Sequence, residues 1–235
     1  MTKMAKLKMA QQRFNTNAPR HGAYKISGLY AVTPDELDTA ALTANIHAAL
    51  RGGAQMVQYR NKVAISDLRL LQATALLALC RSYNVPLIIN DHLDLCAQID
   101  ADGVHLGSTD CDLGAARRLL GADKIIGASC YNQLSLAEKA QEQGASYVAF
   151  GACFSSDTKP NAVNAPLSLF AEAKQKITLP LVAIGGITLQ NAAQVIAAGA
   201  DAIAVVNALF GARQMDNSAA EDIKLSAQQF AHLFG

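Results

Sequence analysis

Residues 181–207 read LVAIGGITLQNAAQVIAAGADAIAVVN. Two short apolar runs, LVAIGG from Leu181 and AIAVVN from Ala202, enclose an alanine-rich segment of helical spacing near 190–198. Strands that are apolar on both faces belong to a parallel sheet that helices cover. The stretch therefore predicts a strand–helix–strand unit with a glycine turn at each change of element.

The same unit recurs along the chain. Strands are predicted to begin at Gly28, Met56, Pro86, Gly103, Ile125, Tyr147, Leu181 and Ala202. Helices are predicted near 38–51, 66–83, 112–120, 133–143, 167–176, 190–198 and 219–233, with a shorter one after Asp91. Gly/Ala-rich turns before several strands are typical of helix C-caps and carry no chemistry. Eight units without a linker predict a single-domain (β/α)8 TIM barrel, an α/β fold, over 23–235.

Composition limits the function classes. The chain has 235 residues, 51% of them hydrophobic, and a net charge of +1, so charge favours neither nucleic acid nor membrane binding. Residues 1–22 are basic and lack the apolar run of a signal peptide, which predicts a flexible extension. Five well-separated cysteines without a C-x-x-C pair favour reduced thiols and a cytoplasmic location over disulfides or zinc.

Polar side chains follow the predicted strands where each strand ends. In this architecture the carboxyl ends of the strands form the active-site mouth. The residues so placed are Gln58, Arg60, Lys62, Asn90, Asp91, His105, Asp110, Ser129, Ser155, Ser156, Thr158, Lys159, Gly185, Gly186 and Asn207. The sequence therefore predicts that carboxylates, cations, hydroxyls and glycine amides converge on one mouth.

This set suits a phosphorylated substrate with a divalent cation. Arg60, Lys62 and Lys159 could neutralise a diphosphate. Asp91 and Asp110 are the hard oxygen ligands that Mg2+ takes alongside water and phosphate. The glycine turn after the seventh strand could hold a second phosphate on its backbone amides.

Each feature also has a structural interpretation. An Arg-x-Lys pair at a strand end is usually a surface pair, and Asn90–Asp91 could cap the following helix. His105 lies in an apolar strand, where a hydrogen-bonded core imidazole is commoner than a catalytic base, and Ser129 could be a helix N-cap. A glycine pair at a βα turn occurs in barrels of every function. Only the joint placement of these residues favours a substrate site.

The combination resembles the thiamine phosphate synthase family, and the likeness runs from about Gly28 to Phe210. Its most specific marks are VQYRNK (57–62), IINDHLDLCAQIDADGVHLGSTD (88–110), IGAS (126–129), GACFSSDTKPNA (151–162) and VAIGGIT (182–188). The order Q-x-R-x-K, N-D, H-L-G-x-x-D and T-K is more specific than the glycine turn alone. The resemblance implies a TIM-barrel transferase that joins a pyrimidine diphosphate to a thiazole phosphate, or its carboxylated form, and releases pyrophosphate.

The resemblance also implies a role for each matching residue. The pyrimidine diphosphate would be held by Gln58, Arg60, Lys62, Asn90, Ser129 and Lys159, with His105 near the pyrimidine. Mg2+ would be carried by Asp91 and Asp110. The thiazole phosphate would meet Ser156, Thr158, Gly185, Gly186, Val206 and Asn207. Of these residues, Arg60, Lys62, Ser129 and Lys159 would carry the chemistry, and the Ser/Asn-rich loop with Lys159 would act as a lid.

Several positions depart from the family pattern. Ala152 and Ser155 replace prolines, Ser156 replaces threonine, Ser108 replaces glutamine and Asn207 replaces serine. These changes affect the expected substrate affinity and leave the charged residues in place. The basic extension lies outside the resemblance.

Three other functions stay open at this point. A thiazole tautomerase on the same barrel would need an acid/base histidine after the fifth strand, where this chain has Ser129 and Cys130. A non-catalytic phosphate-metabolite sensor would lack some of the mouth charges. A sugar-phosphate epimerase would need acid/base residues in place of Lys62 and Lys159. The sequence does not indicate an oligomeric state, so a homo-oligomer also stays open.

Overall fold

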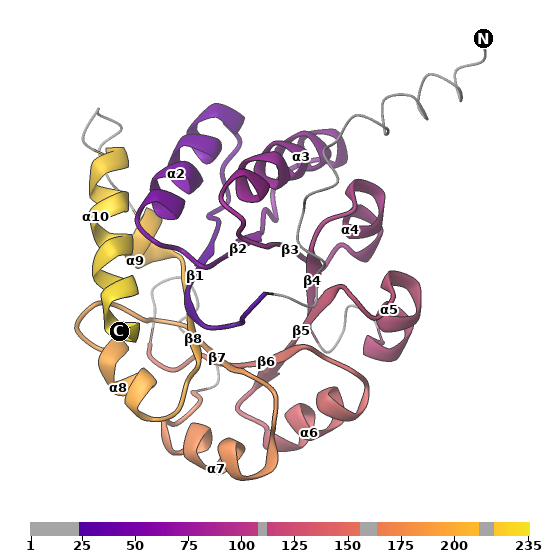
Figure 1. Cartoon of the computed structure of the whole chain (residues 1–235), viewed down its shortest axis with the longest axis vertical. Coiled ribbons are helices and arrows are strands. Elements are labelled where there is room, and N and C mark those ends of the chain that lie inside the picture. Colours follow the sequence, from indigo (N-terminus) through magenta and orange to yellow (C-terminus); the bar gives the residue numbers. More distant parts are fainter. Residues whose placement is uncertain (1–23, 108–111, 156–163, 212–218) are drawn as a thin grey trace.

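The computed structural model describes residues 24–107, 112–155, 164–211 and 219–235. Eight parallel strands pair in sequence order and close into one barrel, and helices surround it (Figure 1). The predicted (β/α)8 barrel is thus confirmed. Its elements are β1 Gly28–Val32, α2 Thr39–Arg51, β2 Met56–Tyr59, α3 Ser66–Ser82, β3 Leu87–Asn90, α4 Leu93–Ile99, β4 Gly103–Leu106, α5 Leu113–Leu120, β5 Ile125–Tyr131, α6 Leu134–Glu142, β6 Tyr147–Phe150, α7 Ser168–Lys176, β7 Leu181–Ile184, α8 Ala192–Ala197, β8 Ala202–Val205, α9 Asn207–Phe210, α10 Ala219–Ala231 and the 3-10 turn η2 His232–Phe234.

The predicted boundaries agree closely with the observed ones. Every strand begins at the predicted residue except β3, which begins one residue later at Leu87. The α9 helix (Asn207–Phe210) was not predicted, because four residues are too few to show a helical period. The predicted extension, 1–22, lies outside the described residues.

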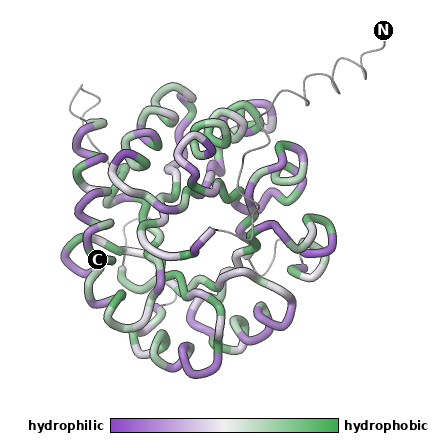
Figure 2. The backbone as a smooth tube through the Cα atoms, viewed as in Figure 1, coloured by the Kyte–Doolittle hydropathy of each residue, from purple (hydrophilic) through white to green (hydrophobic). Residues whose placement is uncertain are grey.

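The core forms two layers. Inside the barrel, side chains from alternate strand positions pack together, including Tyr30, Met56, Ile88, Tyr147 and Val182. The opposite faces of the same strands pack against the helices. Figure 2 shows hydrophobic segments along the barrel wall and hydrophilic ones on the outer turns of the helices. Because strand side chains alternate, each strand serves both layers, which explains its continuous apolar sequence.

Glycines that directly follow the helix C-caps lie at the end of the barrel away from the site. Gly53, Gly144 and Gly199 have φ values of 97°, 84° and 114°, in the left-handed region that favours glycine. Two carboxylates then hold the first residues of the preceding strands: the buried Asp102 accepts from the Leu87 amide at 2.9 Å, and the partly exposed Asp201 accepts from the Leu181 amide at 2.7 Å. The turns are therefore structural, as the sequence predicted.

The barrel closes where its first strand pairs with its last. Gly28 of β1 lies in register with Ala202 of β8, and the α10 helix packs over this seam against α2 and β1. Gly52, which caps α2, allows the close approach, because a Cβ there would lie 2.5 Å from the Ala227 Cβ of α10. The C-terminal helix is thus part of the barrel wall rather than an appendage.

The four cysteines of the described ranges are reduced and buried: Cys80, Cys96, Cys130 and Cys153. Burial raises the pKa of the Cys96 thiol to about 12 and that of Cys153 to about 11. These thiols are therefore protonated packing groups rather than nucleophiles or metal ligands. No helix within the described ranges combines the length and the apolar character that crossing a membrane requires.

Candidate active site

A pocket of about 250 Å3 lies at the carboxyl ends of β2 and β3. Its polar lining consists of Asn61, Lys62, Arg69, Asn90, Asp91 and His92. It brings together a cation, an amide and a carboxylate that the sequence assigned to one site: Lys62, Asn90 and Asp91. Arg69, from the first turn of α3, adds a second cation that the sequence analysis missed, because helix periodicity alone places it on a helix surface.

Asp91 sits at a sharp turn. Its φ is 61°, and its amide donates to the His105 carbonyl of the neighbouring strand at 2.9 Å. A left-handed aspartate is uncommon and marks a position where the surroundings impose the backbone. Neither Asn90 nor Asp91 is the N-cap of α4; that position is His92, and it makes no side-chain capping bond. Asp91 therefore lines the pocket without serving as a helix cap.

Arg60 and Lys62 are held by an aspartate that follows β1. The Asp35 Oδ1 accepts from the Lys62 amide at 2.7 Å and lies 3.3 Å from Arg60 Nη1. The Thr33 hydroxyl accepts from the Arg60 amide at 2.8 Å. Asp35 was missed in the sequence, although it follows a strand end like the residues that were selected. It fixes the loop that presents both cations.

Gln58, His105 and Ser129 face the barrel interior and are linked through two tyrosines. Gln58 Nε2 donates to the Tyr30 hydroxyl at 2.9 Å. His105 Nε2 lies 2.8 Å from Ser129 Oγ, and its Nδ1 lies 2.9 Å from the Tyr147 hydroxyl. Ser129 belongs to β5 and caps no helix. His105 is only 8% exposed, so it is a hydrogen-bonded core imidazole that also contacts the site serine.

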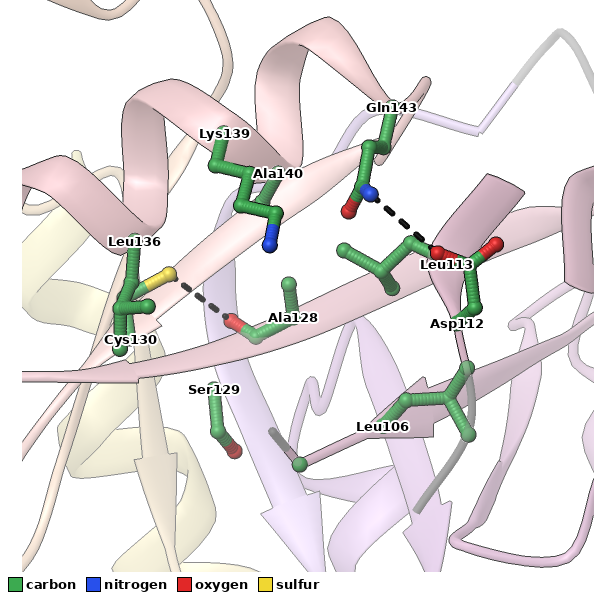
Figure 3. A pocket seen from close by; sticks show the side chains of 11 residues that line it. Leu106, Asp112, Leu113, Ala128, Ser129, Cys130, Leu136, Lys139, Ala140 and Gln143 are labelled. Atoms are coloured by element: carbon green, nitrogen blue, oxygen red, sulfur yellow. Dashed lines mark hydrogen bonds between the residues drawn. The ribbon is translucent and has the colours of Figure 1, made fainter. Parts of the chain in front are cut away.

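A second pocket, of about 360 Å3, lies behind β5, between this strand and α6. Figure 3 shows Lys139 of α6 and its C-cap residue Gln143 on one side of the strand and the Ser129 side chain pointing to the other. Ala128 lies next to Ser129 in the sequence and points toward α6. Strand alternation thus directs the Ser129 side chain into the barrel, where it meets His105, although Ser129 also lines the edge of this second pocket.

The turns after β7 and β8 lie side by side, because Ile184 pairs with Ala204. Gly185 and Gly186 have φ values of 98° and 63°, and the Asn191 amide group donates to the Gly186 carbonyl at 2.9 Å. After β8, Val206 is the N-cap of α9, which begins at Asn207. The two turns therefore lie together at the carboxyl ends of β7 and β8, where the sequence predicted a phosphate site.

Four of the predicted site residues lie outside the described residues: Asp110, Ser156, Thr158 and Lys159. Ser108 lies outside them as well. Within the described ranges, no group of three or more His, Cys, Asp or Glu residues could hold a metal ion. Asp91 is therefore the predicted metal ligand whose position can be assessed.

Comparison with known proteins matches this geometry to one family. A family model described as thiamine monophosphate synthase matches residues 29–209. The thiamine-phosphate synthase of Methylobacillus flagellatus is 56% identical over 215 residues, covering 92% of this chain and 99% of its own. The chain belongs to the thiamine-phosphate synthase family. It is accordingly a transferase of thiamine biosynthesis.

Other relatives agree with this membership. The thiamine-phosphate synthase of Nitrosospira multiformis is 51% identical over 92% of this chain and 91% of its own. The solved thiamine phosphate pyrophosphorylase of Pyrococcus furiosus superposes with a TM-score of 0.76 at 31% identity, covering 88% of this chain and 95% of that one. The predicted family and activity are thus confirmed, and the tautomerase, sensor and epimerase alternatives are set aside.

Proposed function

We propose that the mouth of this barrel binds a pyrimidine diphosphate and a thiazole phosphate, or its carboxylated form, and joins them with release of pyrophosphate. The observation that carries the proposal is the pocket in which Lys62 lies with Asn90 and Asp91 at the ends of two neighbouring strands. Arg60 lies on the same loop as Lys62. Two cations and a hard carboxylate are the groups that a diphosphate with a divalent cation requires.

Asp91 fits a role as a Mg2+ ligand. Asp91 has a left-handed backbone and lines the pocket. Next to it lies Asn90, whose side-chain amide oxygen is also a possible metal ligand. Asp91 would hold the ion together with Asp110. When bound, Mg2+ would neutralise the charge that develops on the departing pyrophosphate. Lys62, Arg60 and, from the predicted lid, Lys159 would add three positive charges to the same oxygens.

The heterocycle would lie over the barrel interior. Because the Gln58 amide nitrogen donates to Tyr30, its carbonyl oxygen remains as an acceptor for the amino group of an aminopyrimidine. Ser129 would donate to the diphosphate, and His105 would lie below the ring.

The chemistry needs few proton transfers. The C–O bond between the pyrimidine methylene and the diphosphate breaks, both electrons leave with pyrophosphate, and the electron-rich aminopyrimidine stabilises the resulting cation. The thiazole nitrogen lone pair then forms the new C–N bond. Arg60 and Lys62 stabilise the leaving anion, and binding at one mouth orients the two substrates.

The thiazole phosphate would bind the turns after β7 and β8. Gly185, Gly186, Val206 and Asn207 would offer backbone N–H groups, and Ser156 and Thr158 would add hydroxyls. The fit around Gly186 is tight: a Cβ there would lie 2.6 Å from the Ser155 carbonyl oxygen and 2.7 Å from that of Phe154.

Gly186→Ala is therefore expected to raise the KM for the thiazole phosphate by about tenfold or more. The new methyl group would displace the turn, and the phosphate would lose a charge-assisted hydrogen bond to a backbone amide. Steady-state kinetics with each substrate varied in turn would measure this. Gly121→Ala is the matched control, because Gly121 also has a positive φ of 84° but nothing within 4 Å of a new Cβ. Equal KM values for Gly186→Ala and wild type would remove this turn from the phosphate site.

The proposed reaction is tested by following pyrophosphate with a coupled assay. Release is expected only when the pyrimidine diphosphate, the thiazole phosphate and Mg2+ are all present, and thiamine phosphate should form in equal amount by mass spectrometry. Omitting either substrate, or chelating the metal, should abolish both signals. A folded sample that forms no thiamine phosphate under complete conditions would refute the proposed function.

We further propose a cytoplasmic location. The support is the set of buried, reduced thiols at Cys80, Cys96, Cys130 and Cys153, which suits a reducing compartment.

A further inference from the structure

Five polar side chains form a continuous hydrogen-bonded chain through the barrel interior. Ser129 Oγ contacts His105 Nε2 at 2.8 Å, His105 Nδ1 contacts the Tyr147 hydroxyl at 2.9 Å, and that hydroxyl contacts the Tyr30 hydroxyl at 2.9 Å. Gln58 Nε2 completes the chain by donating to Tyr30 at 2.9 Å. The chain begins at the mouth and crosses the inner core to the opposite wall.

The Gln58 end of this hydrogen-bond network sets the direction in which its protons are donated. A phenol hydroxyl has one proton, and burial raises the pKa of both tyrosines well above the ordinary value, so both stay protonated. We assign the shared protons from the Gln58 end: Tyr30 accepts from Gln58, its own proton is satisfied by donating to Tyr147, and the Tyr147 proton then goes to His105 Nδ1. His105 must then carry its own proton on Nε2 and donate it to Ser129.

Binding of a diphosphate at Ser129, the other end of the network, requires the same direction of proton donation. Phosphate oxygens of a diphosphate are acceptors, so a serine binds them only by donating its proton. If Ser129 instead donated to His105, it would present lone pairs to the phosphate. A Ser129 oxygen that already accepts from His105 directs its proton to the ligand.

The fold makes room for the central contact. Gly127 of β5 lies against the pair, and a Cβ at this position would overlap the Tyr147 ring and hydroxyl and would come within 2.5 Å of His105 Nδ1. The two rings also stack, with centroids 5.5 Å apart and planes inclined by 21°. A strand residue without a side chain is thus required for the Tyr147–His105 bond, and the bond is a built feature rather than a chance approach.

We propose that Tyr147, supported by Tyr30, is a positioning residue that holds His105 as the Nε2–H tautomer and thereby makes the Ser129 hydroxyl a donor to the substrate diphosphate. This rests on the proposed function, since that function places the diphosphate at Ser129. Neither tyrosine need touch the substrate: both act through the imidazole.

The tautomer is measured directly by long-range proton–nitrogen NMR of protein labelled with 15N-histidine, at about pH 8, where an ordinary imidazole is neutral. His105→Asn assigns the signals among the five histidines. We expect a protonated Nε2 and an unprotonated Nδ1 in the wild type, and a mixture of tautomers in Tyr147→Phe. An Nδ1–H tautomer in the wild type, or an unchanged tautomer in Tyr147→Phe, would overturn the proposal.

Tyr59→Phe is the matched control for these spectra. It removes a buried hydroxyl that donates to Gln72 at 2.8 Å. This contact lies in the layer between sheet and helices, outside the Ser129–Gln58 hydrogen-bond network. The two variants lose the same group at similar burial, so a general loosening of the core would move the His105 signals in both. We expect them to move only in Tyr147→Phe.

A double-mutant cycle on pyrophosphate binding, with Mg2+ present and measured by calorimetry, tests the route through Ser129. Ser129→Ala should weaken binding ~10- to 100-fold, the worth of a hydrogen bond to a charged group. Tyr147→Phe should weaken it ~3- to 10-fold. Because Tyr147 acts through Ser129, the double variant should match Ser129→Ala within about twofold.

Losses that simply multiply in the double variant would overturn the proposal, as would a wild type that does not bind pyrophosphate. Neither measurement needs turnover. A wild type that forms no thiamine phosphate would therefore refute the proposed function while leaving the tautomer result standing, and an additive cycle would refute the role of Tyr147 while leaving the activity intact.

Discussion

Asp91→Asn should lower kcat for pyrophosphate release by roughly a hundredfold or more. A metal ion contributes several kcal/mol of transition-state stabilisation, and each ~1.4 kcal/mol is a factor of ten in rate. Asparagine keeps the shape of the side chain but removes the charge that holds Mg2+. It also tolerates the left-handed φ of 61° at this position, so the fold should not suffer.

The measurement is kcat over a range of Mg2+ concentrations, with thermal unfolding recorded on the same samples. The half-saturating Mg2+ concentration should rise, and the melting temperature should stay at the wild-type value. Asp94→Asn is the matched control, because Asp94 is an exposed carboxylate in the first turn of α4, three residues away. A variant at Asp91 with wild-type rate and metal dependence would mean that this carboxylate holds no catalytic metal.

Gly127→Ala should both destabilise the barrel and impair pyrophosphate binding. The new methyl group would overlap Tyr147, which is fully buried and cannot move outward, so the ring and His105 must shift. Overpacking of this kind costs ~2 kcal/mol or more, which corresponds to a melting temperature about 5 °C lower for a chain of this size. The displaced imidazole would also lose its contact with Ser129.

Thermal unfolding and calorimetry with pyrophosphate measure the two effects separately. Gly114→Ala is the control: Gly114 lies in α5, the nearest atom to its new Cβ is Asp112 Oδ1 at 3.2 Å, and helix propensity favours alanine by about 1 kcal/mol. That variant should melt at or above the wild-type temperature. If Gly127→Ala had the wild-type melting temperature and the wild-type affinity for pyrophosphate, the tight contact around Tyr147 would be disproved.

The sequence predicted the fold almost completely because a parallel barrel has an unusual signature. Strands such as Leu181–Ile184 bury both faces, so they stand out as apolar runs, and left-handed turns such as that at Gly199 mark where each new unit starts. The α9 helix was missed because it has no period of its own to detect.

The strand-end rule grouped residues that the structure does bring together, and it missed partners that lie across the barrel. Lys62, Asn90 and Asp91 come from adjacent strand ends and were placed together correctly. Tyr30 and Tyr147 were not selected from the sequence, because which hydroxyl meets which depends on the register around a closed sheet. Sequence spacing along one strand does not contain that information.

The seam between β1 and β8, with α10 over it, has a consequence for biosynthesis. During synthesis, β1 is made long before its partner β8, so one hydrogen-bonding edge of β1 and the side of α2 that contacts α10 stay uncovered until the later elements are made. Unpaired edges of apolar strands are templates for association with other chains. The edge of β1 therefore stays unprotected until β8 has been made, and folding intermediates with such an edge are prone to aggregate.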